Sequence, residues 1–174
     1  MKTIVKFLSL LLVSSLFLMS CDKNDDGIDD EDENTLVGIQ GEWYSTGTNV
    51  APLLSTYFAV DSIYAKFNTD NTYIVESFNT SNVKTTYSGT YVQTKSTTAN
   101  IYTIAINQST PSVGASEGIF EVYTGQVGYD MKYEVVQSEP AIGNTAPTPT
   151  AGFGSSNGGA LGTINIQKYI RIKK

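Results

Sequence analysis

The feature that most constrains the fold of this 174-residue chain is a series of short runs rich in β-branched and aromatic residues, which begins at Leu36. Polar or glycine-containing segments separate the runs, a pattern typical of antiparallel strands joined by turns. The predicted strands are 40–46, 62–68, 72–79, 83–93, 101–107, 118–124, 128–137 and 163–172. The sequence therefore predicts an all-β domain over residues 36–174.

Two of these runs alternate clearly between apolar and polar residues, which predicts one packed face and one solvent-facing side. In the run 128–137 the predicted packed face carries Tyr129, Met131, Tyr133 and Val135. In the run 163–172 it carries Ile164, Ile166, Ile170 and Ile172. Lys168 falls on that same face, which favours a bulge or a side chain that extends to solvent.

The remaining segments predict one helix and two loops. Asn49 is predicted to cap a short helix that begins near Pro52, with Leu53, Leu54, Tyr57 and Phe58 on one face. A short polar loop is expected at 108–117. A long flexible loop is expected at 138–162, which holds three prolines and six glycines and too little apolar content to pack.

Eight antiparallel strands leave two exposed edges unless the sheet closes on itself. We therefore predict an eight-stranded up-and-down barrel, which is wide enough to be filled by side chains or to hold one small ligand. A Greek-key β-sandwich is the alternative fold.

The N-terminus reads as an export signal. Two lysines precede an apolar run from Phe7 to Met19, which is too short to span a bilayer as a helix. The run ends in Leu18-Met19-Ser20-Cys21, which resembles the lipobox of bacterial lipoproteins. We expect residues 1–20 to be a signal peptide and a lipid on Cys21, the only cysteine, to anchor the chain to a membrane.

Residues 21–35 then read as an acidic, disordered tether, because Asp22 to Glu33 holds eight acids and a single hydrophobic residue. The run is similar to the acidic signal that sends some lipoproteins to the cell exterior, which predicts an outer-membrane protein exposed at the cell surface. Aspartate directly after the lipid cysteine is a retention signal in enteric bacteria, so a periplasm-facing position is the alternative.

The tether also contains a calcium-loop pattern, carried by Asp22, Asn24, Asp26, Asp30 and Glu33 with Gly27 at the turn. No flanking helices are expected, and such acidic stretches match the pattern by chance. The favoured interpretation is a solvated tether without a cofactor, and a weak calcium site is the alternative.

Charge and residue content exclude several functions. From Asn34 onward nine acids face eight bases, so no basic surface for nucleic acid is expected. The chain has no histidine, which removes Ser–His and Cys–His catalysis and the usual zinc sites. Paired carboxylates of a glycan-acting domain remain as an alternative, with the candidates Glu76, Glu117, Glu121, Asp130 and Glu134. Since no motif has its structural context, we expect no enzyme.

A family resemblance appears in three short motifs. Gly41-Glu42-Trp43 matches the G-x-W of lipocalin-like (calycin) domains, and the stretches 67–73 and 89–91 are similar to that family's F-N-x-D-G-T-Y hairpin and G-T-Y. The resemblance implies that Trp43 plugs one end of the barrel and that Arg171 packs across it.

The domain holds all eleven tyrosines of the chain, which suits an amphipathic cavity wall. The residues expected to line a ligand are Tyr87, Tyr91, Tyr129, Met131 and Tyr133. We therefore expect the barrel to bind a small hydrophobic or amphipathic ligand. The alternative is an accessory subunit that binds a surface protein partner.

Overall fold

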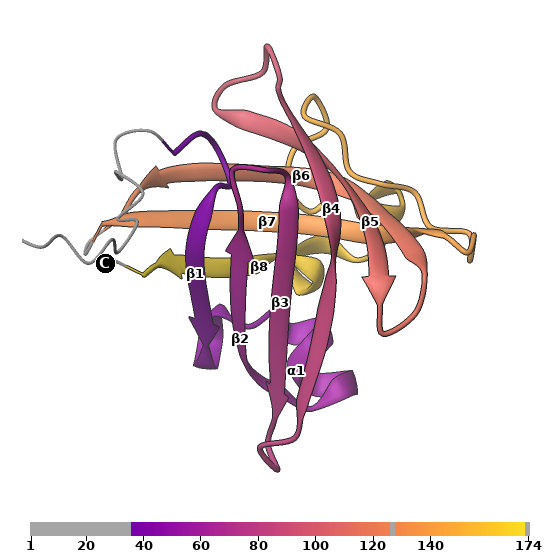
Figure 1. Cartoon of the computed structure of the whole chain (residues 1–174). Helices are drawn as coiled ribbons and strands as arrows, with labels where there is room; N and C mark the ends of the chain where they lie inside the picture. Colours follow the sequence, from indigo (N-terminus) through magenta and orange to yellow (C-terminus); the bar gives the residue numbers. More distant parts are fainter. Residues whose placement is uncertain (1–35, 126–127, 173–174) are drawn as a thin grey trace, which may run out of the picture. The chain divides into compact units, whose positions relative to one another are not determined.

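A computed structural model describes residues 36–125 and 128–172. Eight strands form one closed barrel in which each strand pairs antiparallel with its neighbours in sequence, and β8 closes on β1 (Figure 1). Because no strand crosses over another, the up-and-down barrel prediction is confirmed and the Greek-key alternative is excluded.

The strands are β1 (Gly41–Thr46), β2 (Val60–Phe67), β3 (Thr72–Asn79), β4 (Lys84–Lys95), β5 (Ile101–Thr110), β6 (Gly114–Thr124), β7 (Tyr129–Glu139) and β8 (Gln167–Arg171). The short helix α1 (Pro52–Phe58) follows β1, as predicted. Three single turns of 3-10 helix are η1 (Gly47–Asn49), η2 (Ser156–Gly159) and η3 (Gly162–Asn165). No helix among the described residues has the length and apolar character needed to cross a membrane.

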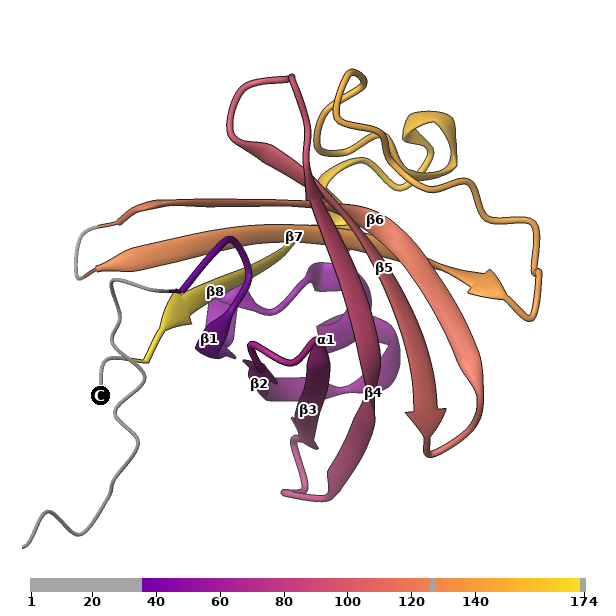
Figure 2. The ribbon, with the colours of Figure 1, turned by 45° about the horizontal axis from the view of Figure 1, so that its top comes forward.

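Antiparallel pairing gives the barrel two different ends. We call the end that carries residues 36–40 and the turns β2–β3, β4–β5 and β6–β7 the floor. We call the other end, which carries α1, the turns β3–β4 and β5–β6 and the segment 140–166, the mouth. Figure 2 tilts the top of Figure 1, with its β2–β3 and β4–β5 turns, toward the viewer.

Two local predictions are wrong. The expected loop 108–117 is mostly strand, because β5 continues to Thr110 and β6 begins at Gly114. Asn49 does not cap α1, whose first turn follows Ala51; its carbonyl instead accepts a hydrogen bond from Gln167. In α1, Leu54 packs against the core while Tyr57 and Phe58 stay 72% and 66% exposed, so the predicted apolar face is only partly buried.

The predicted packed face of the last strand is also wrong. β8 begins at Gln167, after the turn η3, and its buried residues are Gln167 and Tyr169. Ile170 and Ile172 face outward and are 42% and 39% exposed. The reason is hydrogen bonding inside the barrel: the Gln167 side chain accepts from the backbone N–H of Ala51 and donates to the Ser45 hydroxyl. An isoleucine side chain can form neither hydrogen bond.

The segment 138–162 packs against the barrel, contrary to the expectation that it lacks the content to do so. Pro147 and Ser156 are buried, and beneath the segment the outward-facing Ile119, Glu134 and Val136 are buried as well. Polar contacts compensate for the shortage of apolar side chains. The signal peptide, Cys21, the acidic tether and its calcium pattern lie outside the described residues.

Candidate functional site

The floor of the barrel is closed by Trp43 on β1. Its ring is fully buried, and its indole Nε1 donates a 2.7 Å hydrogen bond to the backbone oxygen of Ile39. The Arg171 guanidinium lies 4.6 Å from the Trp43 ring and 5.1 Å from the Tyr129 ring, and it donates to the Gln40 oxygen. This is the arrangement that the resemblance implies for Trp43 and Arg171, and it ties β1 to β8 at this end.

A layer of aromatic side chains fills the barrel just inside the floor. The Phe67 and Tyr91 rings meet edge to face at 5.2 Å, and the Tyr102 and Phe120 rings stack at 4.9 Å. Tyr91 is fully buried, and its hydroxyl donates to the Asn68 oxygen at 2.7 Å. Such ring contacts pack this layer of the interior.

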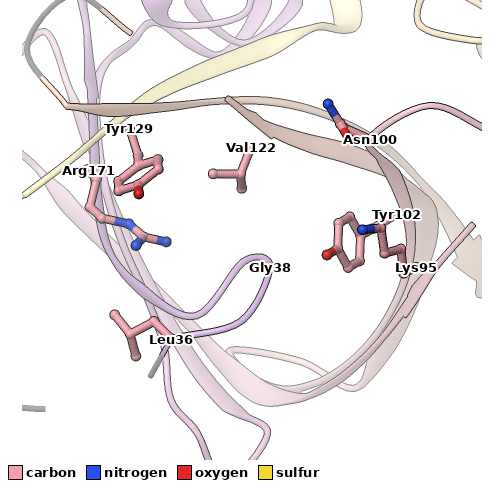
Figure 3. Close-up of a pocket in the computed structure, with 8 residues that line it drawn as sticks. All are labelled: Leu36, Gly38, Lys95, Asn100, Tyr102, Val122, Tyr129 and Arg171. Atoms are coloured by element: carbon pink, nitrogen blue, oxygen red, sulfur yellow. The ribbon is translucent and has the colours of Figure 1, made fainter. Parts of the chain in front are cut away.

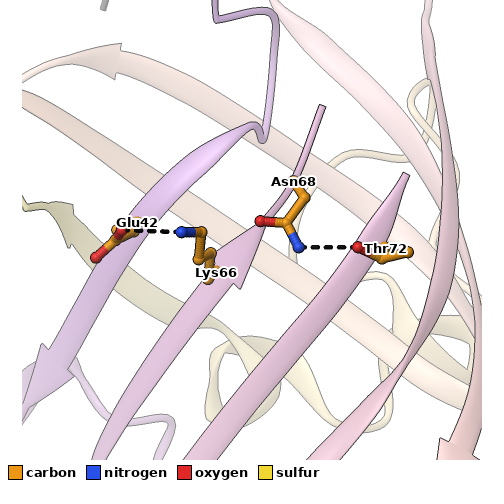
Figure 4. Close-up of polar contacts among 4 residues, drawn as sticks. All are labelled: Glu42, Lys66, Asn68 and Thr72. Atoms are coloured by element: carbon orange, nitrogen blue, oxygen red, sulfur yellow. Dashed lines mark hydrogen bonds and ion pairs between the residues drawn. The ribbon is translucent and has the colours of Figure 1, made fainter. Parts of the chain in front are cut away.

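The β2–β3 hairpin sets the position of Tyr73 at the edge of this layer. Asn68 donates to the Thr72 hydroxyl at 2.8 Å (Figure 4). The Asp70 carboxylate accepts from the backbone N–H and the hydroxyl of Thr72, which lowers the pKa of Asp70. Asn71 takes the left-handed conformation, with φ of 67°, that the family pattern fills with glycine. On the outer face, Lys66 pairs with Glu42 at 3.3 Å.

Toward the mouth the inward-facing side chains are less completely buried. Strand alternation and register point Val75, Tyr87, Tyr133 and Val135 inward, yet all four are only half-buried. Tyr87 and Val135 lie at the rim, beyond the last β4–β5 and β7–β8 pairs, whereas Val75 and Tyr133 lie within the paired wall. These residues border the open end of the interior between the aromatic layer and the mouth, which we call the accessible half.

Three inward-facing tyrosines lie at the inner end of this half, with Tyr73 on β3 and Tyr169 on β8 buried in the core and Tyr133 on β7 packed against it. The Tyr133 and Tyr169 rings meet edge to face at 6.2 Å. The buried hydroxyl of Tyr73 has no hydrogen-bond partner within the described chain. Buried polar groups are nearly always paired, so this hydroxyl marks a polar position inside an otherwise apolar wall.

The acidity of these phenols is suppressed. Burial raises the pKa of Tyr73 to about 12 and also raises that of Tyr169. The pKa of Tyr133 lies well above its usual value, first because of burial and then because Tyr169 and Tyr73 are near. All three hydroxyls are therefore neutral donors at any physiological pH.

The structure divides the predicted ligand residues into three groups. Tyr87 and Tyr133 line the accessible half of the interior. Tyr91 and Met131 are fully buried in the packed half, where they act as core. Tyr129 lies at the floor and is 44% exposed, beside Arg171.

Sequence reasoning missed Tyr73 and Tyr169. Tyr73 is the last residue of the predicted hairpin motif and lies directly opposite Phe67 in the β2–β3 pair. Since residues opposite one another share a face of the sheet, an inward Phe67 indicates that Tyr73 also faces inward. Tyr169 was missed because the isoleucines of the last strand favoured the opposite face as the packed one.

Tyr129 and Arg171 border a separate cavity of about 260 Å³ at the floor (Figure 3). Its other lining residues include Lys95 and Tyr102, with the Lys95 ammonium 5.9 Å from the Tyr102 ring. A second cavity, of about 340 Å³, lies outside the barrel between residues 146–149 and strands β4 to β6.

The candidate carboxylates all lie on the outer face of the barrel rather than in its interior, by the strand register: Glu76, Glu117, Glu121, Asp130 and Glu134. Glu76 pairs with Lys84 at 2.8 Å. Glu134 is fully buried under the 138–162 segment. Among the described residues no three carboxylate, cysteine or histidine side chains gather as a metal site would require.

In comparisons with known proteins, no family model, no curated protein and no solved structure matches this chain.

Proposed function

We propose that this chain is a membrane-anchored, lipocalin-like lipoprotein whose barrel binds a small hydrophobic or amphipathic ligand. The observation that carries the proposal is the contrast between the two halves of the interior. In the middle of the barrel Tyr91, Phe120 and Met131 are fully buried, whereas toward the mouth the inward-facing Val75, Tyr87 and Tyr133 stay partly exposed. An apolar concave space with a few polar groups is typical of a small-molecule site.

Native mass spectrometry of the full chain, purified gently from its own host, tests the ligand. We expect a co-purifying small molecule that is lost in Val75→Trp, since the larger ring fills the accessible space from β3. Val92→Trp is the matched control, because Val92 faces outward on β4 and is 61% exposed. Protein that arrives empty and shows no saturable binding of a fatty-acid or fatty-alcohol probe contradicts the proposal.

The anchor rests on the sequence around Cys21. Radiolabelled fatty acid should enter the wild-type chain and be absent from Cys21→Ala, which should also keep its signal peptide. Protease added to intact cells should degrade the domain if it lies at the cell surface. Protection of the wild-type chain in intact cells would place it on the periplasmic side instead.

An accessory role in a surface complex is the second candidate, and an exposed apolar patch at the mouth favours it. Tyr57 and Phe58 at the end of α1 are exposed, as is Val83 in the β3–β4 turn, and the backbone N–H of Thr80 in this turn donates to the oxygen of Ala59 directly after α1. Exposed apolar patches of this kind commonly bind protein. Wild-type protein that sediments in a large complex, and a Tyr57→Ser/Phe58→Ser variant that sediments alone, would support this role.

A further inference from the structure

We propose that the barrel takes an uncharged ligand whose oxygen acceptor is bound by the hydroxyls of Tyr73, Tyr133 and Tyr169, and that it discriminates against the corresponding carboxylate. The inference rests on the proposed function and names the chemical class of its ligand.

The first step is the supply of donors. Tyr73 is 4% exposed, and its hydroxyl is unpaired within the described chain. Tyr133 and Tyr169 come from the neighbouring strands β7 and β8 and their rings meet edge to face, and Tyr73 belongs to the same hydrophobic cluster. A carbonyl, ether or alcohol oxygen among them would satisfy the buried donor, whose desolvation is otherwise uncompensated.

The second step is the placement of charge. Among the described strand residues, alternation points only two cationic side chains inward, Lys95 and Arg171, and both lie at the floor (Figure 3). Arg171 is held between the Trp43 and Tyr129 rings. The fully buried Trp43 and Met131 fill the interior near this end, so neither cation sits beside the accessible half.

The third step is the cost of burying an anion. A carboxylate that leaves water loses far more solvation than a neutral oxygen does, and neutral donors without a positive partner recover only part of that loss. Here it would meet phenols without a cation. A ketone or alcohol of equal chain length buries the same apolar area and needs only one or two hydrogen bonds. The interior therefore favours the neutral head group.

The test compares decanoate with 2-undecanone, which carry the same alkyl chain, on the purified full chain. Binding is followed by calorimetry and by the fluorescence of Trp43, the only tryptophan. We expect the ketone to bind about tenfold more tightly than the carboxylate at neutral pH, the equivalent of one charge-assisted contact that the site lacks. Because the phenols stay protonated, ketone affinity should not change between about pH 6 and about pH 9.

Tyr73→Phe separates binding from folding. The variant removes an unpaired buried hydroxyl, so its melting temperature should equal or exceed that of the wild type, while ketone affinity falls about tenfold. Tyr64→Phe is the matched control: Tyr64 faces outward on β2 beside Glu42, so ketone affinity should be unchanged.

The outcomes distinguish this inference from the proposed function. Absence of saturable binding for both probes overturns the proposed function. Saturable binding in which decanoate equals or exceeds the ketone overturns the ligand class alone. Unchanged ketone affinity in Tyr73→Phe overturns the role of the tyrosine hydroxyls.

Discussion

Glu134 is predicted to hold the 138–162 segment against the barrel. Its carboxylate is fully buried on the outer face of β7 and accepts three hydrogen bonds from that segment. The donors are the backbone N–H of Gly154 at 2.6 Å, the backbone N–H of Ser156 at 3.0 Å and the Ser156 hydroxyl at 2.5 Å. Glu134→Ala leaves these donors without an acceptor while the segment still covers them.

The magnitude follows from those contacts. Each buried donor that loses its acceptor costs about 1 kcal/mol or more, so Glu134→Ala should lower the free energy of unfolding by about 3 kcal/mol. For a domain of this size such a loss lowers the melting temperature by about 10 °C. Glu134→Gln keeps the side-chain volume but turns one acceptor into a donor, so its loss should be smaller and of the same sign.

Urea unfolding followed by Trp43 fluorescence measures the loss, and limited proteolysis reports where it acts. We expect new cleavage confined to the segment 138–162 in Glu134→Ala. Glu117→Gln is the control, because Glu117 is exposed on the neighbouring strand β6 and should change stability by less than about 0.5 kcal/mol. A Glu134→Ala variant as stable and as protease-resistant as Glu117→Gln would refute the reasoning.

Three further outcomes are expected. Arg171→Met should lower the free energy of unfolding by about 1–2 kcal/mol, measured in urea, through loss of the guanidinium contact with Trp43. Gly89→Ala should lower it by about 2 kcal/mol or more, or leave the chain insoluble, because the new Cβ would lie 2.0 Å from the backbone oxygen of Asn107. Stability should fall as the pH rises from about 10 toward 12, because the phenol of Tyr73 ionises at about pH 10 in the unfolded chain and only near 12 in the folded one; urea midpoints across this range measure the loss.

Much of the barrel follows from local sequence signals. The turn residues Asp70 and Asn71 are placed by their own side chains and backbone, so the hairpin that they close is visible in the sequence. The alternation in β7 likewise identifies Met131 and Tyr133 as inward residues. Short-range patterns predict these features because the deciding contacts lie within a few residues along the chain.

The features that sequence reasoning missed depend on distant partners. Gln167 is buried because its amide meets Ala51 and Ser45, more than a hundred residues earlier. Hydrophobicity alone chose the wrong face there, since a two-residue period has two phases and only tertiary contacts select one. Glu134 looks like a solvent-facing acid until backbone donors from 154 and 156 reach it.

The interior itself separates packing from function. Phe67 and Phe120 fill the aromatic layer without a polar atom, and packing alone gives no reason for a hydroxyl at Tyr73. Left unpaired, that hydroxyl costs about 1–3 kcal/mol of stability. The cost vanishes when an acceptor enters the accessible half of the barrel, so a neutral ligand should stabilise the wild-type chain more than it stabilises Tyr73→Phe. Ligand-induced shifts in melting temperature that are equal in the two proteins would show that the hydroxyl has no part in binding.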